Sequence, residues 1–131
     1  MKVVNDFPPN IELIAQVFRL SGREIFAYGD TIYNPSGGNV SRSLLAHEMV
    51  HSVQQGTDPD AWWDRYLVDP PWRFQQELEA HRAEYRHVVE SGAYSRNQRR
   101  AILKQIAKRL ASPLYGRLAS YEKCRHLITE H

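Results

Sequence analysis

Two histidines with a glutamate between them are the residues best placed to do chemistry in this sequence. They lie in the stretch LLAHEMVHSVQQG, residues 44–56, where His47 and His51 are four positions apart. In a helix, side chains four apart differ by only about 40° around the axis, so both imidazoles can bind one cation. Glu48 points about 60° away from His51, within reach of a water on such a cation. The spacing therefore predicts a zinc site with Glu48 as general base.

A catalytic zinc site needs a third protein ligand, and residues 73–89, RFQQELEAHRAEYRHVV, offer several. Glu77 lies about 70° from the centre of the apolar stripe of this predicted helix, whereas Glu79 lies about 130° away beside Arg82. We expect Glu77 to be the ligand and Glu79 to form a solvated pair with Arg82. His81, one turn after Glu77, is expected to orient a ligand, to bind the metal, or to be a partly buried structural histidine.

The elements that must position these residues follow from capping residues and helix breakers. Ser41 is a suitable N-cap for the motif helix, and the pairs Asp58-Pro59 and Asp69-Pro70 each predict a helix start. Short β-branched and aromatic runs around Gly29-Asp30 predict a small hairpin. The fold class expected is α+β, mainly α, with a short helix from Pro59 and longer helices over about 11–22, 41–55, 71–91, 95–111 and 120–128.

The motif helix has one polar and one apolar side. Leu44 and Gln54 share the side of the histidines, and five apolar residues cover the opposite arc: Leu45, Ala46, Met49, Val50 and Val53. We therefore expect a helix that is buried on both sides, with its polar side facing a cleft.

Composition limits the class of protein. A chain of 131 residues with 42% hydrophobic residues is large enough for one core, and we expect a single domain over 1–131. Cys124 is the only cysteine, which excludes an intrachain disulfide and a cysteine-based zinc site. No signal peptide or membrane span is recognisable, so we expect a cytoplasmic protein.

The net charge of +2 gives no reason to expect nucleic acid as a partner. A basic stretch is interpreted as solvated helix faces: Arg82, Arg86, Arg96, Arg99, Arg100, Lys104, Lys108 and Arg109.

The segments HEMVHSVQQ and ELEAH resemble the gluzincin-type zinc metallopeptidases. The resemblance is to small single-domain, minigluzincin-like forms and to predicted bacterial and phage proteins bearing HExxHxxQQ, and it covers about residues 30–85. It implies a zincin-like domain in which the active-site helix packs on a Glu-bearing helix. By this resemblance His47, His51 and Glu77 bind one Zn²⁺ per chain and Glu48 is the catalytic base.

The chain also departs from related patterns. The metzincin pattern is excluded, because Gln54 stands where that pattern needs Gly and Thr57 where it needs His. Many gluzincin relatives have Asp four residues after the ligand Glu, to hold a zinc-bound His, whereas this chain has His81. Because of this departure, Glu79 is kept as an alternative metal ligand. His81 and Gln54 are kept as candidates that hold a ligand in place or bind the metal themselves. The resemblance further implies that the hairpin strand 31–34 borders the cleft and binds an extended peptide by backbone pairing.

The implied activity is hydrolysis of peptide bonds by a metal-activated water, with a peptide or protein as substrate. The oxyanion that develops needs a further donor, for which Tyr115, Tyr121, Tyr85 and His126 are candidates. The alternative is a helical protein-interaction module with a structural or inactive zinc site. Its support is a run of aromatic residues that could anchor a partner or pack on the core: Trp62, Trp63, Tyr66 and Trp72.

Overall fold

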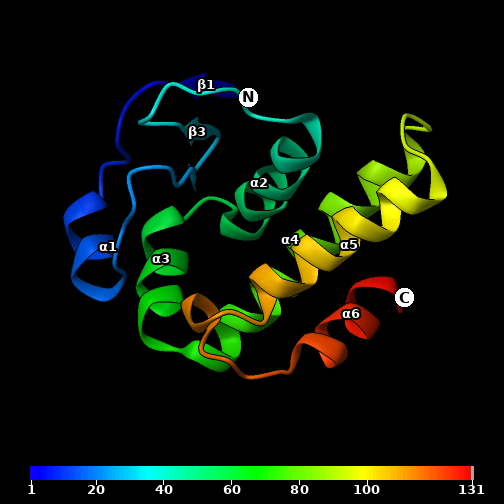
Figure 1. Cartoon of the computed structure of the whole chain (residues 1–131). Helices are drawn as coiled ribbons and strands as arrows, with labels where there is room; N and C mark the ends of the chain where they lie inside the picture. Colours follow the sequence, from blue (N-terminus) through cyan, green and yellow to red (C-terminus); the bar gives the residue numbers. More distant parts are fainter. Residues whose placement is uncertain (131) are drawn as a thin grey trace.

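The computed structural model describes residues 1–130 and is mainly helical, with six α-helices and a three-stranded mixed sheet in that part of the chain (Figure 1). The helices are α1 (Ile11–Val17), α2 (Arg42–Gln55), α3 (Pro59–Val68), α4 (Pro70–Glu90), α5 (Arg96–Leu110) and α6 (Tyr121–Thr129), with a short 3-10 turn η1 (Pro113–Tyr115). The strands are β1 (Lys2–Val4), β2 (Phe26–Tyr28) and β3 (Thr31–Tyr33). The predicted fold class, α+β and mainly α, is confirmed.

The helix starts follow the capping residues. Ser41 accepts a hydrogen bond from the backbone N–H of Leu44, and Asp58 and Asp69 cap α3 and α4 with a proline directly after each. Ser95 forms a reciprocal capping box with Gln98 at the start of α5. The first helix is shorter than predicted, because Phe18 already adopts an extended backbone.

The hairpin of β2 and β3 is confirmed, with Gly29 at a positive φ of 62° in its turn. The strand β1 is not among the predicted elements. It pairs in parallel with β3 and places β3 at the centre of the sheet. The strand 31–34 was expected to be free to bind a peptide, and that expectation is wrong because β3 is paired on both sides. The edge strand β2 lies beside α2 instead.

Two apolar clusters form the core. The larger lies where α4, α5 and α6 meet, and it includes Phe74, Leu78, Ile106, Leu110, Cys124 and Ile128. The smaller joins α1, β2 and α3 through Ile14, Phe26, Trp62, Trp63 and Tyr66. The aromatic run of α3 therefore packs inward onto the core. None of the helices in the described part of the chain combines the length and apolar character that a bilayer crossing requires.

The motif helix α2 is buried on its polar side. Its buried residues are His47, Glu48, His51 and Gln55, and α3, α4 and β2 all pack against it. The apolar arc was expected to be covered as well, but Met49 is 50% and Val53 is 80% exposed. The His47, Glu48 and His51 side chains of α2 thus face the interior, and part of its apolar surface is exposed to solvent.

Candidate metal centre

The helices α2 and α4 pack against each other (Figure 1). A histidine pair on α2 and a glutamate on α4 come together between them. His47 and His51 lie on successive turns of α2, and Glu77 lies about two turns into α4. The distance from His47 Nε2 to Glu77 Oε1 is 3.2 Å, and that from His51 Nε2 to Glu77 Oε2 is 3.0 Å. One ligand atom from each residue lies within 4.8 Å of the others, and all three residues are buried, so this group could hold a metal ion.

The chemistry of the three side chains fits a divalent cation such as zinc. Two imidazole nitrogens and a carboxylate form one of the ligand sets that zinc adopts when a fourth position stays open. Burial would raise the pKa of Glu77, but His51 and His47 hold it well below its ordinary value, so the carboxylate is ionised. Glu77 Oε1 is buried and lies 3.2 Å from His47 Nε2, a contact that a metal ion between the two side chains would replace.

His47 is supported from α4 and α5. Glu84 Oε1 lies 2.9 Å from His47 Nδ1, and Glu84 Oε2 accepts a hydrogen bond of 2.6 Å from Arg109 Nη2. Burial would raise the pKa of Glu84, but His47 and Arg109 lower it to about 2. A carboxylate on the second nitrogen of a ligating histidine fixes the orientation of the ring and increases its basicity.

Glu84 thus supplies the carboxylate beside His47, whereas the residue four positions after Glu77 is His81. Glu84 lies seven residues after Glu77, which is two helical turns, so the two carboxylates share one side of α4. That spacing is a signal in the sequence that could have identified Glu84. Arg109 had no such signal, because it comes from another helix.

His51 is held by the predicted candidate Gln54. The amide oxygen Oε1 of Gln54 lies 2.8 Å from His51 Nδ1, and its amide nitrogen donates to the carbonyl of Gln76 on α4. An amide oxygen only accepts, so His51 Nδ1 carries a proton, and Nε2, which lies 3.0 Å from Glu77 Oε2, is the nitrogen that a metal would bind. Tyr66 on α3 donates a hydrogen bond of 2.6 Å to Glu77 Oε2, a contact that sequence spacing could not reveal.

His81 lies beside the ligand group and not within it. Its Nδ1 donates to the carbonyl of Glu77 at 2.6 Å, and its ring packs against those of His47 and Tyr115. Burial and the nearby His47 lower the pKa of His81 to about 3, so the ring is neutral. Its Nε2 has no partner among the described residues.

The alternative ligand Glu79 is exposed and lies outside the group. Arg82, its expected partner, donates instead to the carbonyls of Leu127 and Glu130 at the end of α6. His87 lies outside the group as well, and His131 falls outside the described residues.

Glu48 and the three candidate ligands line one cleft of about 260 Å³. Burial raises the pKa of Glu48 above its ordinary value, although His47 and His51 act in the opposite direction. Apolar side chains form much of the remaining wall, among them Phe18, Leu20, Ile25, Leu44 and Leu114. The cleft therefore combines a base of raised pKa with a partly apolar wall, to which Arg19, Arg23, Glu24 and Arg109 add charge.

Of the four candidate oxyanion donors, Tyr115 alone lines this cleft. Burial and Glu77 raise the pKa of Tyr115 well above its ordinary value, so its hydroxyl keeps its proton and can donate. Tyr85 and Tyr121 pack against the core cluster of α4, α5 and α6, and His126 lies in a separate groove between α5 and α6. Those three predicted candidates are therefore not placed to donate in the cleft.

No model of a known protein family matches the chain, and neither a curated protein nor a solved structure shows significant similarity to it. The likeness to gluzincin-type metallopeptidases thus depends on the motif residues themselves. What the described residues show is a mainly helical α+β fold with a buried His47, His51 and Glu77 group that could hold a metal ion.

Proposed function

We propose that this protein is a zinc-dependent hydrolase of peptide bonds, with Glu48 as general base. One observation carries the proposal: a buried glutamate of raised pKa lines the same cleft as a His47, His51 and Glu77 group of ligand geometry. A general base works best when its pKa lies near the working pH, and burial moves Glu48 in that direction.

Each side chain then has a distinct task. His47, His51 and Glu77 would hold Zn²⁺, which supplies Lewis acidity and lowers the pKa of a water. Glu48 accepts a proton from that water and returns it to the amine that leaves. Tyr115 donates a hydrogen bond to the oxygen on which negative charge develops.

The substitution Glu48→Gln tests the proposal, because it keeps the shape of the side chain and removes the base. We expect the unsubstituted protein to hold about one zinc per chain, by elemental analysis, and to cleave an unbiased peptide library followed by mass spectrometry. Glu48→Gln should keep the zinc and lose at least about a hundredfold in cleavage rate. Glu79→Gln, an exposed change on α4, is the matched control and should leave both unchanged.

The outcomes separate hydrolysis from metal binding alone. Zinc bound at one per chain without cleavage of any peptide would favour an interaction module with a structural site. Equal cleavage by Glu48→Gln and the unsubstituted protein would refute the role of Glu48.

A further inference from the structure

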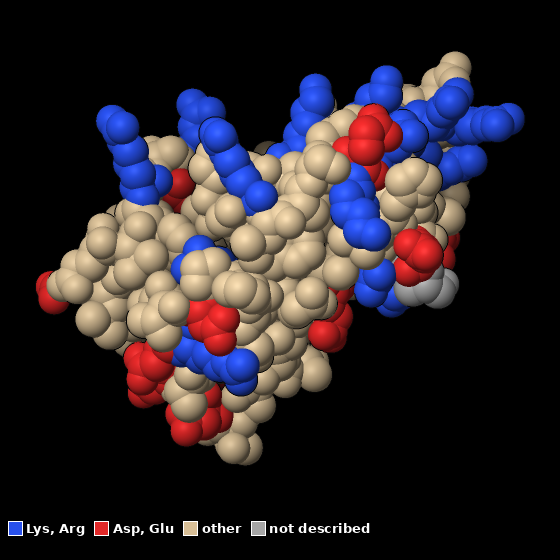
Figure 2. Space-filling view, turned by 90° about the horizontal axis from the view of Figure 1, so that it is seen from below, with Lys and Arg blue, Asp and Glu red and all other residues tan. Residues whose placement is uncertain are grey.

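Charge is divided unevenly along this chain. Residues 96–130 contain nine Lys or Arg and two Glu, a net charge of +7, whereas residues 1–95 contain eight Lys or Arg and thirteen Asp or Glu, a net charge of −5. In space, Lys and Arg side chains crowd the right-hand end of the molecule in Figure 2, where α4 passes into α5 in Figure 1. The small overall charge therefore conceals a strongly basic region.

The helix α5 concentrates this charge in a row. Arg96, Arg100, Lys104 and Lys108 follow one another at every fourth position, and all four are exposed. Such a row has a cation about every 6 Å over about 18 Å of helix. No acidic residue lies in α5, and none of the four cations forms an ion pair within the described residues. Like charges four apart destabilise a helix, so this row lowers the stability of α5.

Other basic residues of the same stretch have structural partners. Arg109 binds Glu84, Arg82 binds the carbonyls at the end of α6, and Arg99 donates to the carbonyl of Tyr94. The exposed row therefore differs from its neighbours, because its charges are not used to hold the fold.

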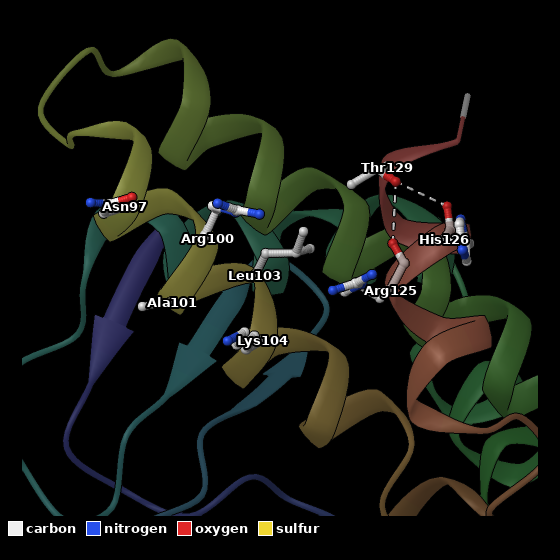
Figure 3. Close-up of a pocket in the computed structure, with 8 residues that line it drawn as sticks. All are labelled: Asn97, Arg100, Ala101, Leu103, Lys104, Arg125, His126 and Thr129. Carbon is white, nitrogen blue, oxygen red and sulfur yellow. Dashed lines mark hydrogen bonds between the residues drawn. The ribbon is translucent and has the colours of Figure 1, made fainter.

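Part of the row borders a groove between α5 and α6 with a volume of about 700 Å³. Figure 3 shows Arg100 from α5 and Arg125 from α6 extending into the space between the two helices, with Leu103 beside them. Lys104 and His126 also line the groove, and Ala101 adds to its apolar part. Arg125 has only an exposed partner, Glu122 at 3.5 Å. The groove thus combines cationic side chains with an apolar floor.

We propose that the groove between α5 and α6 binds a short acidic segment of a partner polypeptide. The row of cations matches about five residues of extended chain, at about 3.4 Å per residue. Carboxylates on such a segment pair with Arg100, Lys104 and Arg125, and an apolar side chain between them contacts Leu103.

Two observations favour a peptide over nucleic acid. Among the described residues no Trp, Tyr or Phe lines the groove and His126 is its one aromatic ring, whereas proteins that bind single strands stack successive bases on several aromatic rings. A long polyanion would also extend over the part of the molecule with a net charge of −5, which repels it. Binding at this groove requires neither a metal nor Glu48, so it is independent of the proposed hydrolysis.

Fluorescence anisotropy with a labelled peptide of glutamates around a central leucine tests the proposal on the full chain. We expect saturable binding that weakens steeply with added salt, and no binding of a lysine peptide of the same length. Arg100→Gln combined with Lys104→Gln should weaken binding about five- to tenfold. Lys2→Gln combined with Arg42→Gln removes the same charge from exposed sites outside the groove and should change binding less than about twofold.

Three results would overturn the proposal. The first is no saturable binding of the acidic peptide at low salt. The second is equal weakening by the two double variants, which would show attraction by net charge alone. The third is tighter binding of single-stranded or duplex DNA of equal charge at the same salt, weakened by the same groove variant, which would assign the groove to nucleic acid. Metal-free protein should give the same affinities, so failure of the hydrolase proposal would leave this test intact.

Discussion

Glu84 connects the candidate ligand His47 to α5, since its two oxygens contact His47 and Arg109 separately. Glu84→Gln keeps the size of the side chain but removes its charge. We expect zinc affinity to fall about 10–100-fold, because His47 loses the carboxylate that orients it and increases its basicity. Competition with a chromophoric chelator measures this change. Glu79→Gln is the matched control on the same helix, and equal zinc affinities of the two variants would contradict the role given to Glu84.

Zinc binding should release protons, because His47 is protonated in the metal-free protein at neutral pH. Burial would lower the pKa of His47, but hydrogen bonds to Glu77 and Glu84 raise it to about 10. Zinc needs a free ligand nitrogen and so displaces a proton at any pH below that value. The apparent zinc affinity should therefore rise about tenfold per pH unit from about pH 7 to 9. Titration calorimetry in buffers of different ionisation enthalpy measures the release, and identical heats in all buffers would argue against it.

Helices proved more predictable than the way they pack. Capping residues such as Ser41, Asp58 and Asp69 act on the nearest turn, so they located the helix starts from local sequence alone. The strand β1 was missed because its three residues pair with β3, far along the chain. The helical wheel of α2 separated a polar from an apolar side correctly. Which side is buried depends on α3, α4 and β2, and local sequence does not contain that information.

In the candidate site, too, residues whose spacing lies within one helix could be predicted, and contacts from other helices could not. The spacing of His47 and His51 and the place of Glu77 on its helix predicted the residues that the structure brings together. Tyr66 and Arg109 contact the ligand group from α3 and α5, through tertiary packing that no spacing rule describes.

Gln55 fastens the edge strand β2 to α2. Its amide nitrogen donates to the carbonyl of Ala27, and its amide oxygen accepts from the N–H of Gly29, both at 2.7 Å. Gln55→Ala leaves the partly buried N–H of Gly29 without this acceptor and should lower the free energy of unfolding by about 2 kcal/mol. Val53→Lys on the same helix should change it by less than about 0.5 kcal/mol, because Val53 is 80% exposed. Urea unfolding followed by circular dichroism compares the two, and a larger loss for Val53→Lys would mean that the apolar arc of α2 is covered.

Across the whole molecule, the candidate metal group is the point at which separate elements converge. The ligands come from α2 and α4, Tyr66 reaches in from α3, and Arg109 binds from α5. Glu48, Glu77 and Glu84 are three carboxyl groups within one buried region, balanced in part by His47. A divalent cation adds positive charge at the centre of this region, so metal binding and folding are expected to be coupled.

Zinc should accordingly stabilise the entire fold. A ligand that binds only the folded state, at a thousand times its dissociation constant, adds about 4 kcal/mol to the free energy of unfolding. For a domain of this size that corresponds to a rise in Tm of about 15 °C, which a chelator should reverse. Calorimetry of the metal-free and zinc-loaded protein measures the shift. Glu48→Gln should show the same zinc-dependent rise in Tm, because Glu48 is not a proposed ligand. Glu77→Gln should abolish that rise. A full shift in Glu77→Gln would mean that zinc stabilises the protein at some other site.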